Sequence, residues 1–279
     1  MDSRPAASAS VSSIRSRCWP RPIAAPEPAL RCPMSSPYST RYYEGLKEDS
    51  AASARVVVPL VLGLFPARTV VDVGCGSGTW TRAYLDAGCD AIGIDGAVVR
   101  EDQLLVPPER FQRRDLAQSL SLGRRFDLAN CLEVAEHLAP KRGPSFAADL
   151  CGLADVVLFS AAVPGQGGTH HVNEQWPSYW IPLFRKQGFV PLDCLRWQLW
   201  EDPRVAWWYV QNAFAFVRES RLADFPAATA AVRPWPTDVV HPRAYVRATV
   251  PAEMSPRMLR EVVRALPHFP GKILAHFKR

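Results

Sequence analysis

The segment VVDVGCGSGTW, residues 70–80, constrains the fold of this chain more than any other segment. A β-rich run leads to Asp72, and glycines then occupy positions 74, 76 and 78 before a helix-like stretch. A glycine-rich turn between a strand and a helix lets the backbone come close to a ligand. The spacing is GxGxG, whereas dinucleotide-binding folds use GxGxxG to seat a pyrophosphate. We therefore expect a strand–turn–helix unit that binds a ligand, and the spacing argues against a nicotinamide oxidoreductase.

Strand and helix signals alternate along the middle of the chain. Short β-rich runs occur at 69–74, 90–95, 126–134 and 155–163, and the segments at about 79–88 and 143–153 look helical. This alternation predicts a parallel sheet with helices on both faces.

Outside these alternating segments the pattern of strand and helix signals differs. The segment from residue 42 onward has helical spacing, with Asp49 or Ser50 as the expected N-cap. Residues 175–187 predict a helix begun or kinked by proline, and residues 189–200 and 205–217 read as two successive long strands. Two strands without a crossover helix predict an antiparallel pair at the sheet edge.

Two further acids follow expected strands. Asp95 ends the second β-rich run, about twenty residues after the glycine turn, where a carboxylate can accept hydrogen bonds from both hydroxyls of a ribose. Asp115 follows the third expected strand, where a carboxylate could accept a hydrogen bond from an adenine amino group. Three such groups at strand ends on one side of a sheet indicate a nucleoside-containing ligand.

With these motifs the chain resembles class I S-adenosylmethionine (SAM)-dependent methyltransferases. The first motif of that family looks like VVDVGCGSG, and FDLANCLEVAEHL resembles the fourth-strand motif of small-molecule O-methyltransferases. The resemblance covers about residues 45–217. It implies an α/β, Rossmann-like, doubly wound and mostly parallel seven-stranded sheet, with an antiparallel last strand and helices on both faces. It also implies SAM as the cofactor.

The same resemblance assigns the cofactor contacts. Asp72 and Gly74 would line the methionine end, Asp95 the ribose, and Asp115 with Leu116 the adenine. The complete set of expected cofactor-binding residues is Asp72, Gly74, Cys75, Gly76, Gly78, Asp95, Asp115 and Leu116.

The segment LEVAEHL, residues 132–138, places Glu133, Glu136 and His137 at the end of the fourth strand. Two carboxylates and an imidazole could bind a divalent ion, with His170 or His171 as a further ligand. Similar EVxEH motifs hold a metal in methyltransferases acting on quinone precursors and in those that methylate the terminal 2′-hydroxyl of small RNAs. In many other methyltransferases the Glu or His caps a helix or orients substrate, and we expect that role rather than a metal.

The segment GQGGTHHVNEQWPSYW, residues 165–180, begins at the same sheet edge. Its glycines predict a loop that bends over a pocket, and residues 173–175 read as the start of a helix. Its aromatic residues, Trp176, Tyr179 and Trp180, are expected mostly to pack in the core. For a hydroxyl acceptor the expected base is His171, His170 or His137, oriented by Glu133 or Glu136.

Further aromatic residues, Trp207, Trp208 and Tyr209, open the expected last strand. They could form an acceptor platform beside Gln211 and Asn212, but packing on the sheet face is the stronger interpretation. The strip from 159 to 180 is also similar to bacterial methyltransferase-domain proteins of glycan and secondary-metabolite gene sets, which suggests a sugar or small-metabolite acceptor.

The ends of the chain differ in composition from its middle. Residues 1–40 are rich in Ala, Ser, Pro and Arg, and we expect a disordered extension rather than a transit peptide, or a translation start at Met34. We assign the methyltransferase domain to residues 41–218. Residues 219–279 read as a proline-dotted tail with one amphipathic helix at 255–269.

Composition narrows the partners and the compartment. None of the seven cysteines forms a CxxC pair, which suits buried thiols in a reducing, cytoplasmic setting. The longest apolar run, residues 56–65, is too short to cross a bilayer. The net charge of +6 comes without a Lys/Arg run in the middle of the chain, so we expect no nucleic-acid partner.

The leading hypothesis is a SAM-dependent methyltransferase that acts on a small molecule or a glycan, with oxygen as the expected acceptor atom. A metal-assisted 2′-O-methyltransferase of RNA ends is the second hypothesis, favoured by the EVAEH cluster and disfavoured by the lack of a basic stripe. A catalytically silent, methyltransferase-like binding protein is the third, but the intact glycine turn and acids argue against it.

Overall fold

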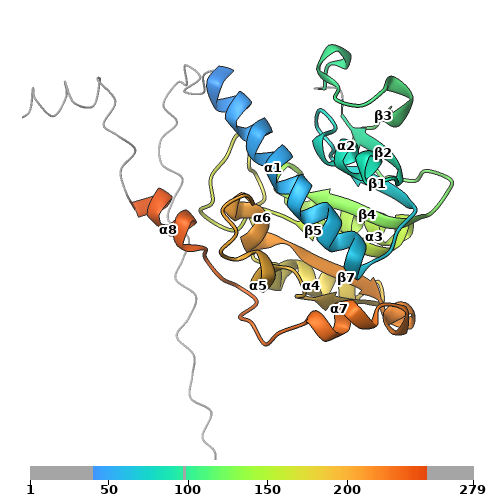
Figure 1. Cartoon of the computed structure of the whole chain (residues 1–279), viewed down its shortest axis with the longest axis vertical. Helices are drawn as coiled ribbons and strands as arrows, with labels where there is room; N and C mark the ends of the chain where they lie inside the picture. The colour runs from blue at the N-terminus through green and yellow to red at the C-terminus, as the bar shows by residue number, and fades with distance from the viewer. Residues whose placement is uncertain (1–39, 97–98, 250–279) are drawn as a thin grey trace, which may run out of the picture. The chain divides into compact units, whose positions relative to one another are not determined.

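A computed structural model describes residues 40–96 and 99–249 of the 279-residue chain. Its seven-stranded sheet has the strand order β3-β2-β1-β4-β5-β7-β6 (Figure 1). The strands are β1 (Thr69–Val73), β2 (Asp90–Asp95), β3 (Phe111–Arg113), β4 (Phe126–Leu132), β5 (Ala154–Ser160), β6 (Phe189–Leu192) and β7 (Phe214–Arg218).

Helices and 3₁₀ turns connect these strands. The helices are α1 (Thr40–Leu64), α2 (Thr79–Asp86), α3 (Gly143–Leu153), α4 (Pro177–Arg185), α5 (Arg196–Leu199), α6 (Trp207–Asn212), α7 (Pro226–Ala231) and α8 (Pro242–Thr249). The 3₁₀ turns are η1 (Glu101–Gln103), η2 (Pro108–Arg110), η3 (Ala135–His137), η4 (Pro140–Arg142) and η5 (Glu219–Asp224).

The topology confirms the predicted fold class. Strands β1 to β5 pair in parallel, whereas β7 runs antiparallel to both β5 and β6. The strand order reverses between β1 and β4, because β1 lies between β2 and β4. In open α/β sheets ligands bind at such a switch point, beyond the carboxyl ends of the strands. A ligand site is therefore expected in the segments that follow β1, β2, β4 and β5.

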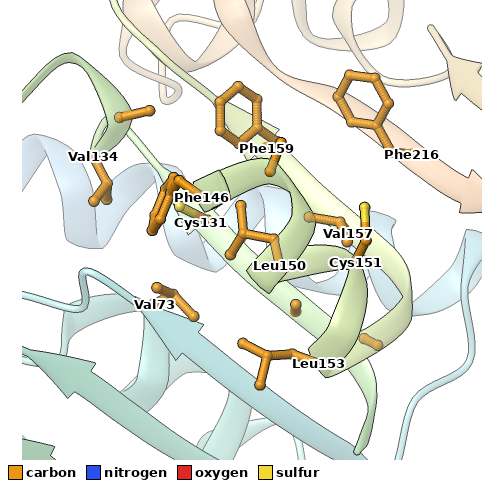
Figure 2. Close-up of a cluster of buried hydrophobic side chains, with 14 of the residues drawn as sticks. Val73, Cys131, Val134, Phe146, Leu150, Cys151, Leu153, Val157, Phe159 and Phe216 are labelled. Atoms are coloured by element: carbon orange, nitrogen blue, oxygen red, sulfur yellow. The ribbon is translucent and has the colours of Figure 1, made fainter. Parts of the chain in front are cut away.

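Two hydrophobic cores cover the two faces of the sheet. Adjacent residues of β1 belong to different cores, with Val70 in one and Val71 in the other, as strand pleating requires. Helices α3 and α4 cover the first face, where Phe146 and Leu150 of α3 are fully buried against β4 and β5 (Figure 2). Helices α1 and α2 pack on the other face, with α6 contributing Tyr209. Burial on both faces explains why the strand sequences are almost continuously apolar.

The prediction of two long strands at residues 189–200 and 205–217 was wrong in the length of both strands. Only residues 189–192 and 214–218 are strand; α5 and α6 lie between them. Trp207, Trp208 and Tyr209 therefore lie on a helix and do not open the last strand. Aromatic and β-branched residues favour strands locally, but tertiary packing decides here: the helix buries Tyr209 and Val210 in the core.

Two expected helix starts also differ from the structure. Helix α1 begins at Thr40, so Asp49 and Ser50 lie inside it and not at its N-cap. Helix α4 begins at Pro177, with Trp176 as N-cap, rather than at residues 173–175. The reason at α4 is that the Glu174 carboxylate bonds to the preceding loop instead of to the first helical turn.

The described part of the expected tail, residues 219–249, contacts the rest of the sheet domain. Arg196 of α5 is fully buried, and its guanidinium donates hydrogen bonds to the carbonyls of Pro236 (2.8 Å) and Thr237 (3.0 Å). The indole of Trp197 donates to the carbonyl of Ala231 (2.8 Å). The expected helix at 255–269 lies outside the described residues, as does the expected N-terminal extension up to residue 39. Across 40–96 and 99–249, no helix combines the length and the apolar character that a membrane span requires.

Candidate active site at the carboxyl edge of the sheet

The glycine turn after β1 is tied to the end of β2. One Asp95 carboxylate oxygen accepts the backbone N–H of Gly76 (2.6 Å), and the other accepts that of Gly96 (2.6 Å). Each oxygen keeps a further lone pair for a ligand hydroxyl. Asp95 thus fixes the turn and at the same time presents a carboxylate at the ligand edge.

Two glycines of the turn serve different purposes. A side chain at Gly74 would meet Val134 at 2.3 Å, so Gly74 is required for packing against the segment that follows β4. Gly76 has φ +54° and no atom within 4 Å of the position a Cβ would take. The open side of the turn is therefore at Gly76, where a ligand can approach the backbone.

Asp72 lies beneath the turn and is almost fully buried. Its two oxygens accept hydrogen bonds from the hydroxyl of Thr81 and the amide of Asn130, each at 2.7 Å. Burial raises the pKa of Asp72 to about 6, and these two hydrogen bonds partly oppose the rise. Both oxygens are engaged inside the protein, so Asp72 supports the turn from below. Burial likewise raises the pKa of the neighbouring Cys75 thiol, which packs against Gly93.

The segment after β3 forms the third part of this edge. Asp115 accepts the backbone N–H of Ala117 (2.9 Å), and Leu116 is buried. Arg142 holds the segment in place by donating to the carbonyls of Leu116 (3.1 Å) and Gln118 (2.7 Å), and it pairs with Asp149. Sequence reasoning missed Arg142, because nothing in the segment PKRGP signals a contact with residues 116–118.

Glu133 follows β4 in a left-handed backbone conformation, φ +57°, which is rare for a residue with a side chain. Its carboxylate accepts hydrogen bonds from Gln166 (2.7 Å) and Asn212 (3.0 Å). Burial raises its pKa, although the hydrogen bonds from Asn212, Ser160 and Gln166 oppose the rise. Strained residues of this kind concentrate at functional sites. Gln166 was not predicted as a site residue, and Asn212 was expected only beside an aromatic platform on the last strand; no local pattern relates either of them to Glu133.

Glu136, His137 and His171 converge at the same edge. Each brings one potential ligand atom to within 4.8 Å of the others, and the rings of His137 and His171 meet edge to face at 4.9 Å. Glu136 is fully buried, and neither carboxylate oxygen accepts a hydrogen bond of normal geometry from the described residues. Burial raises the pKa of Glu136 well above its ordinary value, and the nearby Glu133 raises it further. Burial lowers the pKa of His137, as does the neighbouring His171.

The structure separates the remaining predicted residues from this cluster. Glu133 is not one of the three converging groups, because its carboxylate is directed to Gln166 and Asn212. His170 is exposed and has φ +61°, whereas His171 is largely buried and bonds to Glu174 (2.9 Å). Tyr179 and Trp180 of α4 pack into the core against α3, as expected for most of the aromatic residues of this strip.

A sequence profile described as a methyltransferase domain matches residues 46–201, more than half of the chain. The chain belongs to the methyltransferase-domain family. The match confirms the predicted methyltransferase domain. The empty space beside Gly76 and the two carboxylates, Asp95 and Asp115, fit a SAM site.

One curated relative matches a part of this methyltransferase. The ubiquinone biosynthesis O-methyltransferase of Methylococcus capsulatus is 39% identical over 80 residues, which cover 25% of this chain and 33% of the relative. The chain thus matches about a third of the length of that relative.

Solved methyltransferase structures are similar at lower identity. A sugar N-methyltransferase from Streptoalloteichus is 18% identical, with a TM-score of 0.45, covering 70% of this chain and 98% of that chain. A magnesium protoporphyrin IX methyltransferase from Synechocystis with bound S-adenosylhomocysteine is 18% identical, with a TM-score of 0.43, covering 66% and 90%. An O-methyltransferase family protein from Burkholderia thailandensis is 15% identical, with a TM-score of 0.45, covering 65% and 60%.

Proposed function

We propose that this methyltransferase transfers a methyl group from SAM to an oxygen atom of a small molecule or a glycan. The observation that carries the proposal is the placement of the Glu136, His137 and His171 cluster at the same sheet edge as the Asp95-supported glycine turn. A proton acceptor and a cofactor cradle then lie along one ligand-binding edge. The partial match to an O-methyltransferase supports oxygen as the acceptor atom.

In this proposal the cofactor residues divide the work by position. Asp95 accepts from the ribose hydroxyls, and Asp115 with Leu116 meets the adenine. Gly76 gives backbone access to the methionine part, while Asp72, Gly74, Cys75 and Gly78 hold the turn in shape. When bound, SAM supplies a methyl group activated by its sulfonium.

The chain's own residues would position the acceptor and take its proton. Alignment of the two reactants supplies much of the rate acceleration in a bimolecular transfer. His171 or His137 would take the proton from the acceptor hydroxyl at a ring nitrogen as its oxygen bonds to the methyl carbon. Glu133, fixed by Gln166 and Asn212, would orient the acceptor. His170 is exposed and is the weakest of the three predicted bases.

Calorimetric titration with SAM and S-adenosylhomocysteine tests the cofactor part, and absence of binding to both would refute it. The acceptor part is tested by measuring S-adenosylhomocysteine release with a panel of sugars, phenols and amines, and by locating the added methyl by mass spectrometry. We expect a product methylated at oxygen, and His171→Ala to reduce kcat by about 100-fold. Methylation of amines alone would overturn the proposed acceptor atom.

A second candidate function is metal-assisted methylation, with the 2′-hydroxyl of an RNA end as the acceptor. The Glu136 carboxylate favours it, because this fully buried group has no hydrogen-bond partner of normal geometry among the described residues, and a bound cation would lower the cost of ionising it there. Glu136, His137 and His171 offer a mixed oxygen and nitrogen donor set that suits Mn²⁺, Fe²⁺ or Zn²⁺. A metal there would polarise the acceptor oxygen.

Metal analysis of the purified protein and activity with and without a chelator separate the two functions. Metal bound in proportion to protein, lost in Glu136→Gln, would support the metal-assisted reaction. Full activity after chelation would exclude it. Low-salt binding of short single-stranded RNA tests the RNA acceptor separately.

A further inference from the structure

Residues 163–176, here called the rim loop, are closed by one side chain. Both oxygens of Glu174 accept backbone N–H groups of the loop, from Gly165 (2.8 Å) and from Gly167 (2.8 Å). The oxygen that serves Gly167 also bonds to Nδ1 of His171 (2.9 Å). From the sequence, Glu174 is expected only as part of a helix start, and none of these hydrogen bonds is indicated.

These bonds decide which nitrogen of His171 carries hydrogen. A carboxylate only accepts hydrogen bonds, so Nδ1 of His171 must be the donor toward Glu174. In a neutral imidazole the second nitrogen, Nε2, then bears the lone pair. Nε2 is accordingly the nitrogen that can take a proton or bind a cation.

A second contact fixes the plane of the same ring. Gly168 lies directly against His171, since a Cβ at position 168 would come within 2.3 Å of Nε2 and 2.4 Å of Cε1. The φ of Gly168 is not positive, so the steric contact, not the backbone conformation, excludes a side chain there. His137 meets the ring from its edge. Glu174 and Gly168 thus hold His171 from two sides.

We propose that Glu174 is the positioning residue of this active site, which fixes the tautomer and orientation of His171 so that Nε2 faces the reaction. The proposal rests on the proposed role of His171 as acceptor base or cation ligand. In this proposal the rim loop does more than cover the site. Its backbone N–H groups hold the Glu174 carboxylate by hydrogen bonds, and the carboxylate in turn holds the His171 imidazole. Partners of this kind typically change activity or metal affinity by 10- to 100-fold when removed.

Glu174→Gln tests the proposal, because the amide keeps the size of the side chain. The amide has one acceptor oxygen where the carboxylate has two. In either orientation its NH₂ group faces an N–H of the loop, at Gly165 or at Gly167, so the side chain is displaced from its place beside Nδ1 and the preference for hydrogen on that nitrogen weakens. We expect kcat to fall by about 10- to 100-fold, with KM for the acceptor and the dissociation constant of SAM within about twofold of wild type. Glu201→Gln, which changes an exposed carboxylate, is the matched control and should retain full activity.

The tautomer itself has a readout that needs no activity. Nitrogen NMR of ¹⁵N-histidine-labelled protein distinguishes the protonated ring nitrogen from the one bearing a lone pair, and His171→Asn identifies the signal. We expect Nδ1–H in the wild type and a change in Glu174→Gln. An unchanged tautomer with unchanged kcat would overturn the proposal. A changed tautomer in a protein whose activity survives His171→Ala would uphold the positioning role and refute the proposed role of His171.

Gly168→Ala provides an independent test should Glu174→Gln fold poorly. The added methyl must displace the His171 ring without altering any polar group, so kcat should fall while SAM binding persists. Gly152→Ala, where nothing lies within 4 Å of the added methyl, is the control. Equal kcat in the two alanine variants would contradict the proposal.

Discussion

Single carboxylates at this sheet edge differ in what they do because their surroundings differ. Asp95 joins two backbone N–H groups and keeps capacity for a ligand, whereas Asp72 spends both oxygens on Thr81 and Asn130. Glu136 has no such partners within the described residues. The three acids therefore differ in role. Asp95 is placed to bind the ligand, Asp72 supports the turn, and Glu136 is a buried carboxyl group that can hold a proton or bind a cation.

Asp95→Ala should weaken SAM binding without unfolding the protein. The change removes acceptors for the ribose hydroxyls. Loss of one hydrogen bond to a charged acceptor, with a net value of about 1.5–3 kcal/mol, raises the dissociation constant by about 10- to 150-fold, and we expect a rise of at least this size. Calorimetry measures the change, and thermal denaturation without ligand controls for lost stability. SAM affinity equal to that of the wild type would contradict the ribose role of Asp95.

Asp72 should make the stability of the ligand-free protein depend on pH. Its pKa is about 6 in the folded protein and 3.8 when unperturbed, so between these values the folded state binds more protons than the unfolded state. The free energy of unfolding therefore falls as pH rises from about 4 to 6, by about 3 kcal/mol from this group. Chemical denaturation of Asp72→Asn should lack this loss, so the variant gains on the wild type as pH rises. A constant difference between the two at pH 4 and pH 8 would refute the raised pKa.

At the scale of elements, the loops after the strands carry the site and the helices hold the loops. The segment after β3 is pinned by Arg142, which stands in the 3₁₀ turn η4 immediately before α3. The segment after β4 lies close against Gly74 of the first loop, where any side chain would collide with Val134. The sequence analysis identified each loop, but these contacts between loops were not predictable, because they join residues that no local pattern relates.

Arg142→Lys should weaken SAM binding through the adenine-side segment. The guanidinium serves two carbonyls and Asp149 together, whereas an ammonium on a flexible stem lacks this planar fork. We expect a loss of about tenfold in SAM affinity, with a smaller effect on the rate of S-adenosylhomocysteine release at saturating SAM. Arg124→Lys, at an exposed arginine over Phe126, serves as the control and should bind SAM as the wild type does. Equal affinities in both variants would show that residues 116–118 hold their position without Arg142.

At the scale of the whole molecule, the segment after β7 is bound to the sheet domain. Its carbonyls at 236 and 237 satisfy Arg196, whose side chain is fully buried, and Ala228 of α7 is part of the core. The boundary expected at residue 218 divides these contacts. We therefore expect the smallest stable unit to extend beyond 218.

Two shortened chains test this expectation. A chain ending at Thr249 keeps the contacts of residues 228, 236 and 237 and serves as the reference. A chain ending at Arg218 leaves the Arg196 guanidinium without two of its acceptors, and should lose about 3 kcal/mol or more of stability. Limited proteolysis and thermal denaturation measure both effects. Equal stability of the two shortened chains would support an independent domain that ends at 218.

The sequence by itself determined the alternation of strands and helices from β1 to β5, the glycine turn and the acids that follow β2 and β3. Those features are readable because hydrophobic periodicity and turn chemistry act between residues a few positions apart. Only the tertiary structure decided that residues 207–212 form a helix, that His171 rather than His170 joins Glu136 and His137, and that Glu174 closes the rim loop. These outcomes depend on which side chains are buried together and which hydrogen bonds remain to be satisfied. Tyr209 meets Ser50 and Trp80 across long stretches of the chain, and even the short-range bonds of Glu174 depend on how the loop is folded at the sheet edge.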